Sequence, residues 1–334
     1  MKFYKLLFSS TVVLGTLISI SSYSWLSMWM GLEINLLSII PLLKDNKNLY
    51  PSEAALKYFI TQALASSILL FSIILSLNLS EFVQVPNNFI ILIMNSALLT
   101  KLGAAPFHSW FPEVMEGLNW INGTIMLTWQ KIAPMILLMY NYQLTNFIMA
   151  IIIFSSILSG ILGLNQVSLR KILAYSSINH ISWMLASMLN SQTIWMIYFL
   201  IYTLITLNLV IIFHIFKVFY LMQFLSVMNE MKLIKFFLSV ILSLGGLPPF
   251  LGFFPKWMVI NNLVANNFFM LSVLLIIFTL ISLYFYLRVS FSTFLINSNE
   301  TLFMRSKKIN GWIYFFNFLT MIGLLVCTLI FNLT

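Results

Sequence analysis

The chain has 334 residues, of which 61% are hydrophobic and only 7% are charged, and its mean hydropathy is +0.99. A soluble globular protein is typically about 25% charged, because its surface must stay hydrated. The composition therefore excludes a soluble fold and predicts an all-α polytopic membrane protein. The single cysteine, Cys327, excludes iron–sulfur clusters, zinc–cysteine sites and internal disulfides within this chain. The sequence contains neither of the glycine-rich nucleotide-binding motifs GxGxxG and GxxxxGK(S/T).

Taken in chain order, eleven segments meet the length of about 20 mostly apolar residues that a membrane helix needs. We expect transmembrane helices over 3–22, 24–43, 54–78, 87–110, 121–141, 146–164, 172–189, 193–217, 235–262, 267–290 and 311–332. The fourth and the ninth segments are interrupted by glycine and proline. The first segment carries Lys2 and Lys5 before its apolar run, as a signal peptide does. No alanine occurs before Ala54, so the small-residue cleavage site of a signal peptide is absent and we expect a retained helix.

Eleven spans place the basic residues of the loops on one side of the membrane. Fourteen of the seventeen Lys and Arg residues fall there, and the only charged residue in the opposite loops is Glu81. Because basic residues concentrate on the inner side, the N-terminus is expected inside and the C-terminus outside. The net charge of +9 is thus interpreted as an orientation signal rather than as a nucleic-acid site. The fourteen are Lys2, Lys5, Lys44, Lys47, Lys57, Arg170, Lys171, Lys217, Lys232, Lys235, Arg288, Arg305, Lys307 and Lys308.

Four charged residues fall well inside the predicted spans, away from the span ends: Glu33, Lys101, Lys131 and Lys256. Each central charge costs about 2.5 to 3.5 kcal/mol, so the four together cost on the order of 10 kcal/mol. Burial favours the neutral form of a lysine and a nearby carboxylate favours the charged form, so a moving partner can switch its protonation. The pattern therefore favours a proton relay. The alternative is a set of buried ion pairs that fix helix packing, although three bases and one acid do not balance.

The two interrupted segments are similar to each other. The sequence LGAAPF (102–107) corresponds to LGGLPPF (244–250), and each copy has a lysine nearby. Paired, proline-interrupted helices are typical of repeat-built transporters, whose ion path lies at the breaks. We expect the helices to open at Gly103, Pro106, Gly245, Gly246, Pro248 and Pro249. The copies lie on the fourth and the ninth spans, five positions apart, and so cross the membrane in opposite directions. We therefore expect a single membrane domain (1–334) with two inverted repeats, about 3–141 and 146–290, and an extra helix at 311–332.

Four motifs resemble those of the antiporter-like, proton-translocating subunits of respiratory NADH dehydrogenase (complex I). They are KLGAAPFHSWFPEVMEG (101–117), WQKIAP (129–134), LRKILAYSSINHISWML (169–185) and GGLPPFLGFFPKW (245–257). The resemblance covers nearly the whole chain, and the abundance of Ile, Met, Phe and Asn resembles the mitochondrially encoded version of arthropods.

The resemblance implies a role for each charged residue. Glu33 and Lys101 match the family's glutamate–lysine pair, Lys131 its connecting lysine and Lys256 the terminal lysine of the second half-channel. His180 matches a histidine on the axis between the halves. Its alternative role is a packed polar residue that is hydrogen-bonded to Ser176 or Ser177. His108 and His214 lie near the ends of their spans and are not expected to relay protons.

The resemblance also implies a place in the cell. It implies a core subunit of the H⁺-translocating NADH:ubiquinone oxidoreductase in the inner mitochondrial membrane, with the N-terminus in the matrix and the C-terminus in the intermembrane space. NADH, FMN, iron–sulfur clusters and ubiquinone would belong to partner subunits, and this chain would hold no cofactor or metal. Expected partners are other membrane-arm and accessory subunits and phospholipids, but no nucleic acid. Two alternatives remain, namely a subunit of a multisubunit cation/proton antiporter and a purely structural membrane-arm subunit.

Overall fold

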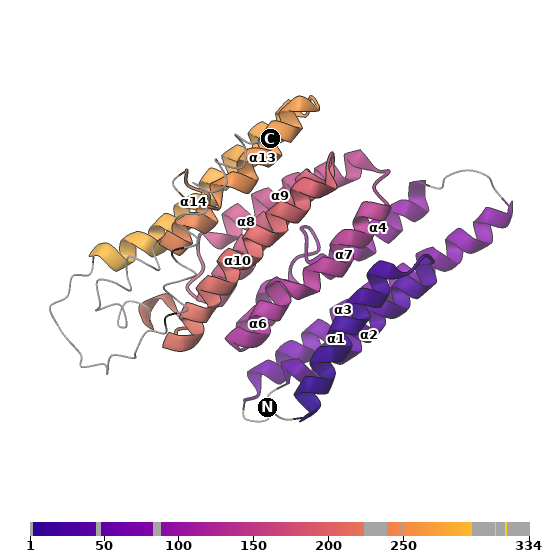
Figure 1. The fold of residues 1–334 in the computed structure, drawn as a ribbon, viewed down its shortest axis with the longest axis horizontal. Helices are drawn as coiled ribbons and strands as arrows, with labels where there is room; N and C mark the ends of the chain where they lie inside the picture. The colour runs from indigo at the N-terminus through magenta and orange to yellow at the C-terminus, as the bar shows by residue number, and fades with distance from the viewer. Residues whose placement is uncertain are drawn as a thin grey trace. The chain divides into compact units, whose positions relative to one another are not determined.

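The computed structural model describes residues 3–44, 48–82, 88–223, 239–248 and 250–295, together with the single positions Gly311 and Phe318. Within this part of the chain the fold is helical (Figure 1). The helices are α1 (Phe3–Ser21), α2 (Trp25–Leu43), α3 (Tyr50–Phe82), α4 (Asn88–Leu102), α5 (Trp110–Gly117), α6 (Trp120–Leu127), α7 (Trp129–Tyr140), α8 (Thr145–Gly163), α9 (Leu169–Met188), α10 (Gln192–Phe216), α13 (Phe253–Ala265) and α14 (Phe269–Leu295).

The chain forms two compact units, Met1–Ile151 and Ile152–Thr334. In the first unit α1 and α2 form a tight hairpin, and the two helices lie side by side in Figure 1. A β-carbon on Gly31 would lie 2.5 Å from the backbone nitrogen of Ser19, and one on Gly15 would lie 2.9 Å from the backbone nitrogen of Asn35. Such close backbone approach through small residues is how membrane helices pack without a hydrophobic driving force.

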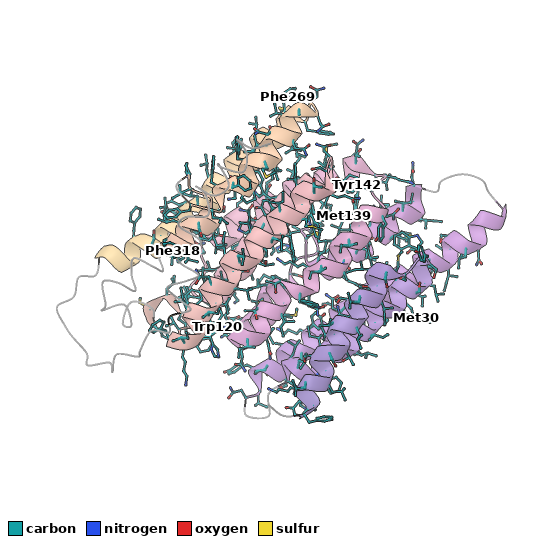
Figure 2. All side chains as sticks on the ribbon, in the orientation of Figure 1. Met30, Trp120, Met139, Tyr142, Phe269 and Phe318 are labelled. Carbon is teal, nitrogen blue, oxygen red and sulfur yellow. The ribbon has the colours of Figure 1, made fainter. Side chains whose placement is uncertain are left out.

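The outer faces of the helices are apolar. Met30 of α2 is 50% exposed and Phe269 of α14 is 53% exposed, and both are labelled on the surface in Figure 2. Large exposed apolar areas are unfavourable in water but suit contact with lipid tails. Among the described residues, six helices are long and apolar enough to cross a membrane: α1, α2, α3 up to Asn78, α8, α10 and α14 up to Phe291.

The second unit contains a helix of a different kind. In α9 every residue from Ile172 to Met188 except Tyr175 is buried, and α10, α13 and α14 of the same unit pack against it. Its sequence includes His180 and several serines, and it is less apolar than the six helices above. A helix that faces other helices rather than lipid can carry polar side chains, provided that they find partners.

Most of the expected spans correspond to helices, one is divided, and one lies almost entirely outside the described residues. The expected span 121–141 is divided at Thr128 into α6 and α7. The Thr128 hydroxyl donates to the carbonyl of Thr124 at 2.7 Å, an interaction that bends helices, and Pro134 cannot donate to the carbonyl of Gln130. The expected helix 311–332 lies outside the described residues except for Gly311 and Phe318, as do residues 235–238 of the ninth span.

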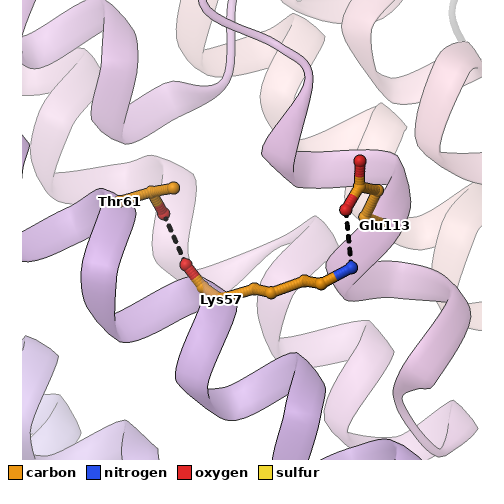
Figure 3. A network of polar contacts seen from close by, with 3 residues as sticks. All are labelled: Lys57, Thr61 and Glu113. Atoms are coloured by element: carbon orange, nitrogen blue, oxygen red, sulfur yellow. Dashed lines mark hydrogen bonds and ion pairs between the residues drawn. The ribbon is translucent and has the colours of Figure 1, made fainter.

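One exposed ion pair links the ends of two elements in the first unit. Lys57 Nζ, near the start of α3, donates to Glu113 Oε2 of α5 at 2.7 Å, and the Thr61 hydroxyl donates to the carbonyl of Lys57 (Figure 3). The two charged side chains are 54% and 56% exposed. The contact places Lys57 and Glu113 at the same end of this unit.

Candidate functional site

Lys101 is the penultimate residue of α4, directly before the helix stops. Its side chain is 7% exposed. The helix ends because Gly103 adopts a φ of +73°, a left-handed conformation that favours glycine, and its N–H bonds back to the carbonyls of Leu99 and Thr100. The chain then runs without helix, through Pro106, until α5 begins at Trp110.

The break leaves carbonyl groups at the end of α4 that cannot bond within the helix. The indole Nε1 of Trp110 donates to the carbonyl of Thr100 at 3.1 Å, and the side-chain amide of Gln62 in α3 donates to the carbonyl of Lys101 at 3.4 Å. Protein side chains therefore satisfy backbone groups that lipid could not. His108 lies in this break, where its Nδ1 is 3.3 Å from the carbonyl oxygen of Pro106.

Lys131 lies in the first turn of α7, three residues after the division at Thr128. It is 2% exposed and is among the largest fully buried side chains of the chain. Its Nζ lies 5.8 Å from the centre of the Phe111 ring, a distance at which a cation interacts with an aromatic face. The side chain is thus in the interior of the first unit.

Lys101 and Lys131 border the same cavity. The cavity has a volume of about 20 Å³. A site needs about 10 to 15 Å³ open to the centre of a water molecule, together with two to four polar partners, to hold one water. The cavity therefore has room for about one water between the two lysines. Its polar lining consists of Asn35, Tyr58, Gln62, Lys101, Gln130 and Lys131.

Glu33 lies in the middle of α2 and is partly buried. Its carboxylate is near enough to act on the ammonium group of Lys101 through space, although these two described side chains form no direct ion pair. Because α2 also contributes Asn35 to the cavity, one helix carries both the acid and a polar wall of the space beside the lysine. The first unit thus brings together Glu33, Lys101 and Lys131, which are 30 to 98 residues apart in the sequence.

In the second unit Lys256 occupies the other helix break. Its Nζ donates to the carbonyl of Gly245 at 2.8 Å and lies 5.8 Å from the centre of the Trp183 ring. Gly246, with a φ of +80°, ends the helical segment 239–245, and Pro248 follows in an exposed turn. Pro249 lies outside the described residues. The ammonium group therefore lies at the C-terminal end of a helix, where the backbone dipole favours a positive charge.

His180 lies in the buried helix α9. Its Nδ1 shares a hydrogen bond of 2.9 Å with the hydroxyl of Tyr198 in α10, and the Tyr202 ring lies 5.0 Å away, centre to centre. The hydroxyls of Ser176 and Ser177 donate to carbonyls of their own helix at 2.7 Å. One partner of His180 is therefore an aromatic hydroxyl of the next helix. His214 is exposed near the end of α10.

The polar neighbours of the lysines and of His180 were not found by sequence reasoning. They are Asn35, Tyr58, Gln62 and Gln130 in the first unit and Tyr198 in the second. One signal was available: Asn35 and Gln130 are polar residues inside apolar spans, each within two positions of a predicted relay residue. Tyr198 gives no such signal, because tyrosine is common in membrane helices.

Comparison with known proteins identifies relatives along nearly the whole chain. The chain is 50% identical over 333 residues to NADH-ubiquinone oxidoreductase chain 2 of Anopheles gambiae, with 97% of each chain covered. It is 51% identical over 332 residues to the protein of the same name from Aedes aegypti, again with 97% of each covered, and 45% identical to that of Locusta migratoria. All three organisms are insects, as the composition indicated.

Solved structures share the fold. A chain of respiratory complex I from Thermus thermophilus with bound aureothin has a TM-score of 0.85 and 25% identity, covering 97% of this chain and 78% of that one. A chain of the Mrp complex from Dietzia has a TM-score of 0.72 and 15% identity, covering 84% and 58%. The family described as NADH:quinone oxidoreductase/Mrp antiporter, TM, matches residues 22–282. This match agrees with the insect relatives, which cover 97% of the chain, and with the buried lysines at two helix breaks. The chain belongs to the NADH:quinone oxidoreductase/Mrp antiporter family of membrane proteins.

Proposed function

We propose that the chain is a core membrane subunit of the respiratory NADH:ubiquinone oxidoreductase and moves protons across the inner mitochondrial membrane. The relay consists of Glu33, Lys101, Lys131, His180 and Lys256. The observation that carries the proposal is the cavity in the first unit, where two buried lysines border one space with room for a water and an acid acts on the first of them. Such an arrangement suits proton transfer, because each lysine can lose and regain its proton through the water.

In this mechanism Glu33 controls the charge of Lys101. When the carboxylate and the ammonium group approach, the charged form of the lysine is favoured, and when they separate the lysine releases its proton. The proton passes through the water to Lys131 and leaves the first unit. In the second unit Lys256, seated at the end of its broken helix, takes the corresponding role, and the Tyr198 hydroxyl orients His180.

The energy comes from elsewhere in the enzyme. Moving one charge against the membrane potential costs about 2.3 kcal/mol per 100 mV. We propose that partner subunits hold NADH, FMN, iron–sulfur clusters and ubiquinone, and that their redox reaction drives this subunit through contacts with neighbouring membrane-arm subunits. The N-terminus is proposed to lie in the matrix and the C-terminus in the intermembrane space, with inverted repeats over about 3–141 and 146–290 and an extra helix at 311–332.

The alternative of a cation/proton antiporter subunit has less support. The likeness to the Mrp chain is one of fold at 15% identity, whereas the insect relatives named for the oxidoreductase are about half identical over 97% of the chain. Purification of the chain in its native membrane together with flavin and iron–sulfur proteins would support the oxidoreductase. Purification with only other antiporter subunits would contradict it.

The test is a Lys131→Met substitution in the assembled enzyme, reconstituted into vesicles. We expect NADH oxidation to slow, or fewer protons to be moved per electron, because methionine preserves the length of the side chain but cannot carry a proton. Lys44→Met is the matched control, since Lys44 is exposed at the end of α2. Normal oxidation and normal pumping by the assembled Lys131→Met enzyme would refute the relay.

A further inference from the structure

Two amide side chains, Asn35 (buried) and Gln130 (partly buried), pair across the first unit. Asn35 Nδ2 donates to Gln130 Oε1 at 3.1 Å, and Gln130 Nε2 donates to Asn35 Oδ1 at 3.0 Å. Asn35 is 3% exposed. Each amide uses one donor and one acceptor for the other, so both bonds depend on one mutual geometry. A reciprocal pair of this kind in a low-dielectric interior holds its two helices more firmly than a single bond would.

The pair joins the two elements that carry the first half of the relay. Asn35 lies two residues after Glu33 in α2, and Gln130 directly precedes Lys131 in α7. This turn of α7 has few other constraints from its own helix, since α6 has ended at Leu127 and Pro134 has no N–H for the carbonyl of Gln130. The position of this turn therefore depends on contacts with neighbouring helices, and the pair with Asn35 supplies two of them.

The same two amides form part of the cavity wall between Lys101 and Lys131. After pairing, each amide still has one N–H to donate, while the second lone pair of Gln130 Oε1 accepts from the hydroxyl of Tyr58 at 3.5 Å. An amide can donate to a water or accept from it whatever the charge of the lysines, and it does not itself change charge. These properties suit a group that fixes the path of a proton without carrying it.

We propose that Asn35 and Gln130 are positioning residues that keep the cavity between Lys101 and Lys131 one water wide and that transmit displacements of the Glu33 helix to Lys131. The inference rests on the proposed relay and adds to it a mechanical link, which acts through side chains that never titrate. A displacement of α2 that alters the contact between Glu33 and Lys101 would, through this pair, also move the turn that carries Lys131.

The test exchanges the two amides in the assembled enzyme. Gln130→Asn shortens its side chain by about 1.5 Å, one carbon–carbon bond, which lengthens the contacts of 3.0 and 3.1 Å beyond hydrogen-bonding range. Asn35→Gln crowds the same space. The double variant with both substitutions again has one asparagine facing one glutamine, so the reciprocal pair can re-form. The readout is the number of protons moved per electron in vesicles, together with the pH dependence of NADH oxidation.

We expect each single substitution to lower the proton-to-electron ratio by about twofold or more, since displacements near 1 Å strongly impair transfer between positioned groups. The double variant should recover most of the ratio. Asn95→Gln is the matched control: Asn95 Nδ2 donates to the backbone carbonyl of Asn141 and Asn141 Nδ2 donates to Asn95 Oδ1, both at 3.2 Å, but neither residue lines the cavity. This control should leave the ratio unchanged even where it lowers the amount of assembled enzyme.

A second variant guards against failure of assembly. Asn35→Leu combined with Gln130→Met replaces both amides by apolar side chains and so leaves no unpaired buried amide, a change that is often nearly neutral for stability. It should assemble and pump with a lowered ratio. An unchanged ratio in the single variants and in this one, or a double exchange no better than the singles, would overturn the inference. Lys131→Met, measured alongside, separates the two proposals: normal pumping there would refute the relay itself.

Discussion

The position of the Lys256 side chain depends on the absence of a β-carbon at Gly246. A β-carbon at this position would lie 2.8 Å from Cδ, 2.9 Å from Nζ and 3.0 Å from Cε of the lysine. Contacts below 3.0 Å are not tolerated, so something must move. Since the nearest atoms belong to a flexible side chain rather than to backbone, the lysine should give way. Gly246→Ala is therefore expected to displace the ammonium group from the carbonyl of Gly245.

Two costs of this substitution can be estimated. The φ of +80° costs a residue with a side chain about 1 to 2 kcal/mol. Loss of the 2.8 Å bond from Lys256 Nζ to the Gly245 carbonyl costs about 1.5 to 3 kcal/mol if the group is charged. The sum, about 2.5 to 5 kcal/mol, is a large fraction of the stability of an ordinary domain. The variant should assemble poorly, and the enzyme that does assemble should move fewer protons per electron.

The assay compares the amount of assembled enzyme on native gels with the proton-to-electron ratio in vesicles. Gly160→Ala is the matched control, because its β-carbon would meet Ile281 at an ordinary 3.5 Å and the backbone there is helical. This control should assemble and pump normally. Parental assembly and pumping by Gly246→Ala would refute the reasoning, and so would an equal loss in both variants, since the effect would then not come from Lys256.

Three further substitutions test other parts of the structure. Gly31→Ala should force α1 and α2 apart and cost about 1 to 3 kcal/mol, measured as a lower yield of assembled enzyme, because the new β-carbon would lie 2.5 Å from a backbone nitrogen of α1. Tyr198→Phe keeps the ring but removes the hydroxyl that bonds His180 at 2.9 Å, so pumping should fall while assembly is preserved. Lys57→Met should change neither assembly nor pumping measurably, because the ion pair with Glu113 is more than half exposed and surface pairs contribute little.

Each of these has a result that would contradict it. Normal assembly of Gly31→Ala would mean that the two helices have room to separate at no cost. Unchanged pumping in Tyr198→Phe would place His180 outside the proton path, as a packed polar residue. A marked loss of assembly in Lys57→Met would show that the pair with Glu113 is buried in the assembled enzyme and therefore contributes more than an exposed pair does.

Four of the six apolar helices could be predicted from the sequence almost to the residue. Four expected spans, 3–22, 24–43, 146–164 and 193–217, agree with α1, α2, α8 and α10 within one residue at each end. The reason is physical: lipid demands about 20 apolar residues in a row, and polar residues mark where the bilayer ends. The four mid-membrane charges were visible for the same reason, because each is unfavourable in that setting.

The contacts between helices could not be predicted in this way. Asn35 and Gln130 are 95 residues apart, and nothing in either segment indicates that their faces meet. The division at Thr128 is likewise hidden in a continuous apolar run, because it depends on how one hydroxyl and one distant proline act together. Hydropathy indicates whether a segment is surrounded by lipid or by water, whereas these features depend on which helices pack against each other.

The buried helix α9 shows where this distinction leads. It is excluded from the six apolar helices, yet it is among the most deeply buried elements of the second unit. Because its neighbours rather than lipid surround it, α9 can hold His180 and Asn179, each bonded to a side chain of another helix: Tyr198 of α10 and Ser282 of α14. In a membrane protein the least apolar helix is therefore the one most able to contain a polar path. The same argument explains why the buried lysines lie at helix ends and breaks, where backbone carbonyls and side-chain amides replace the water that lipid excludes.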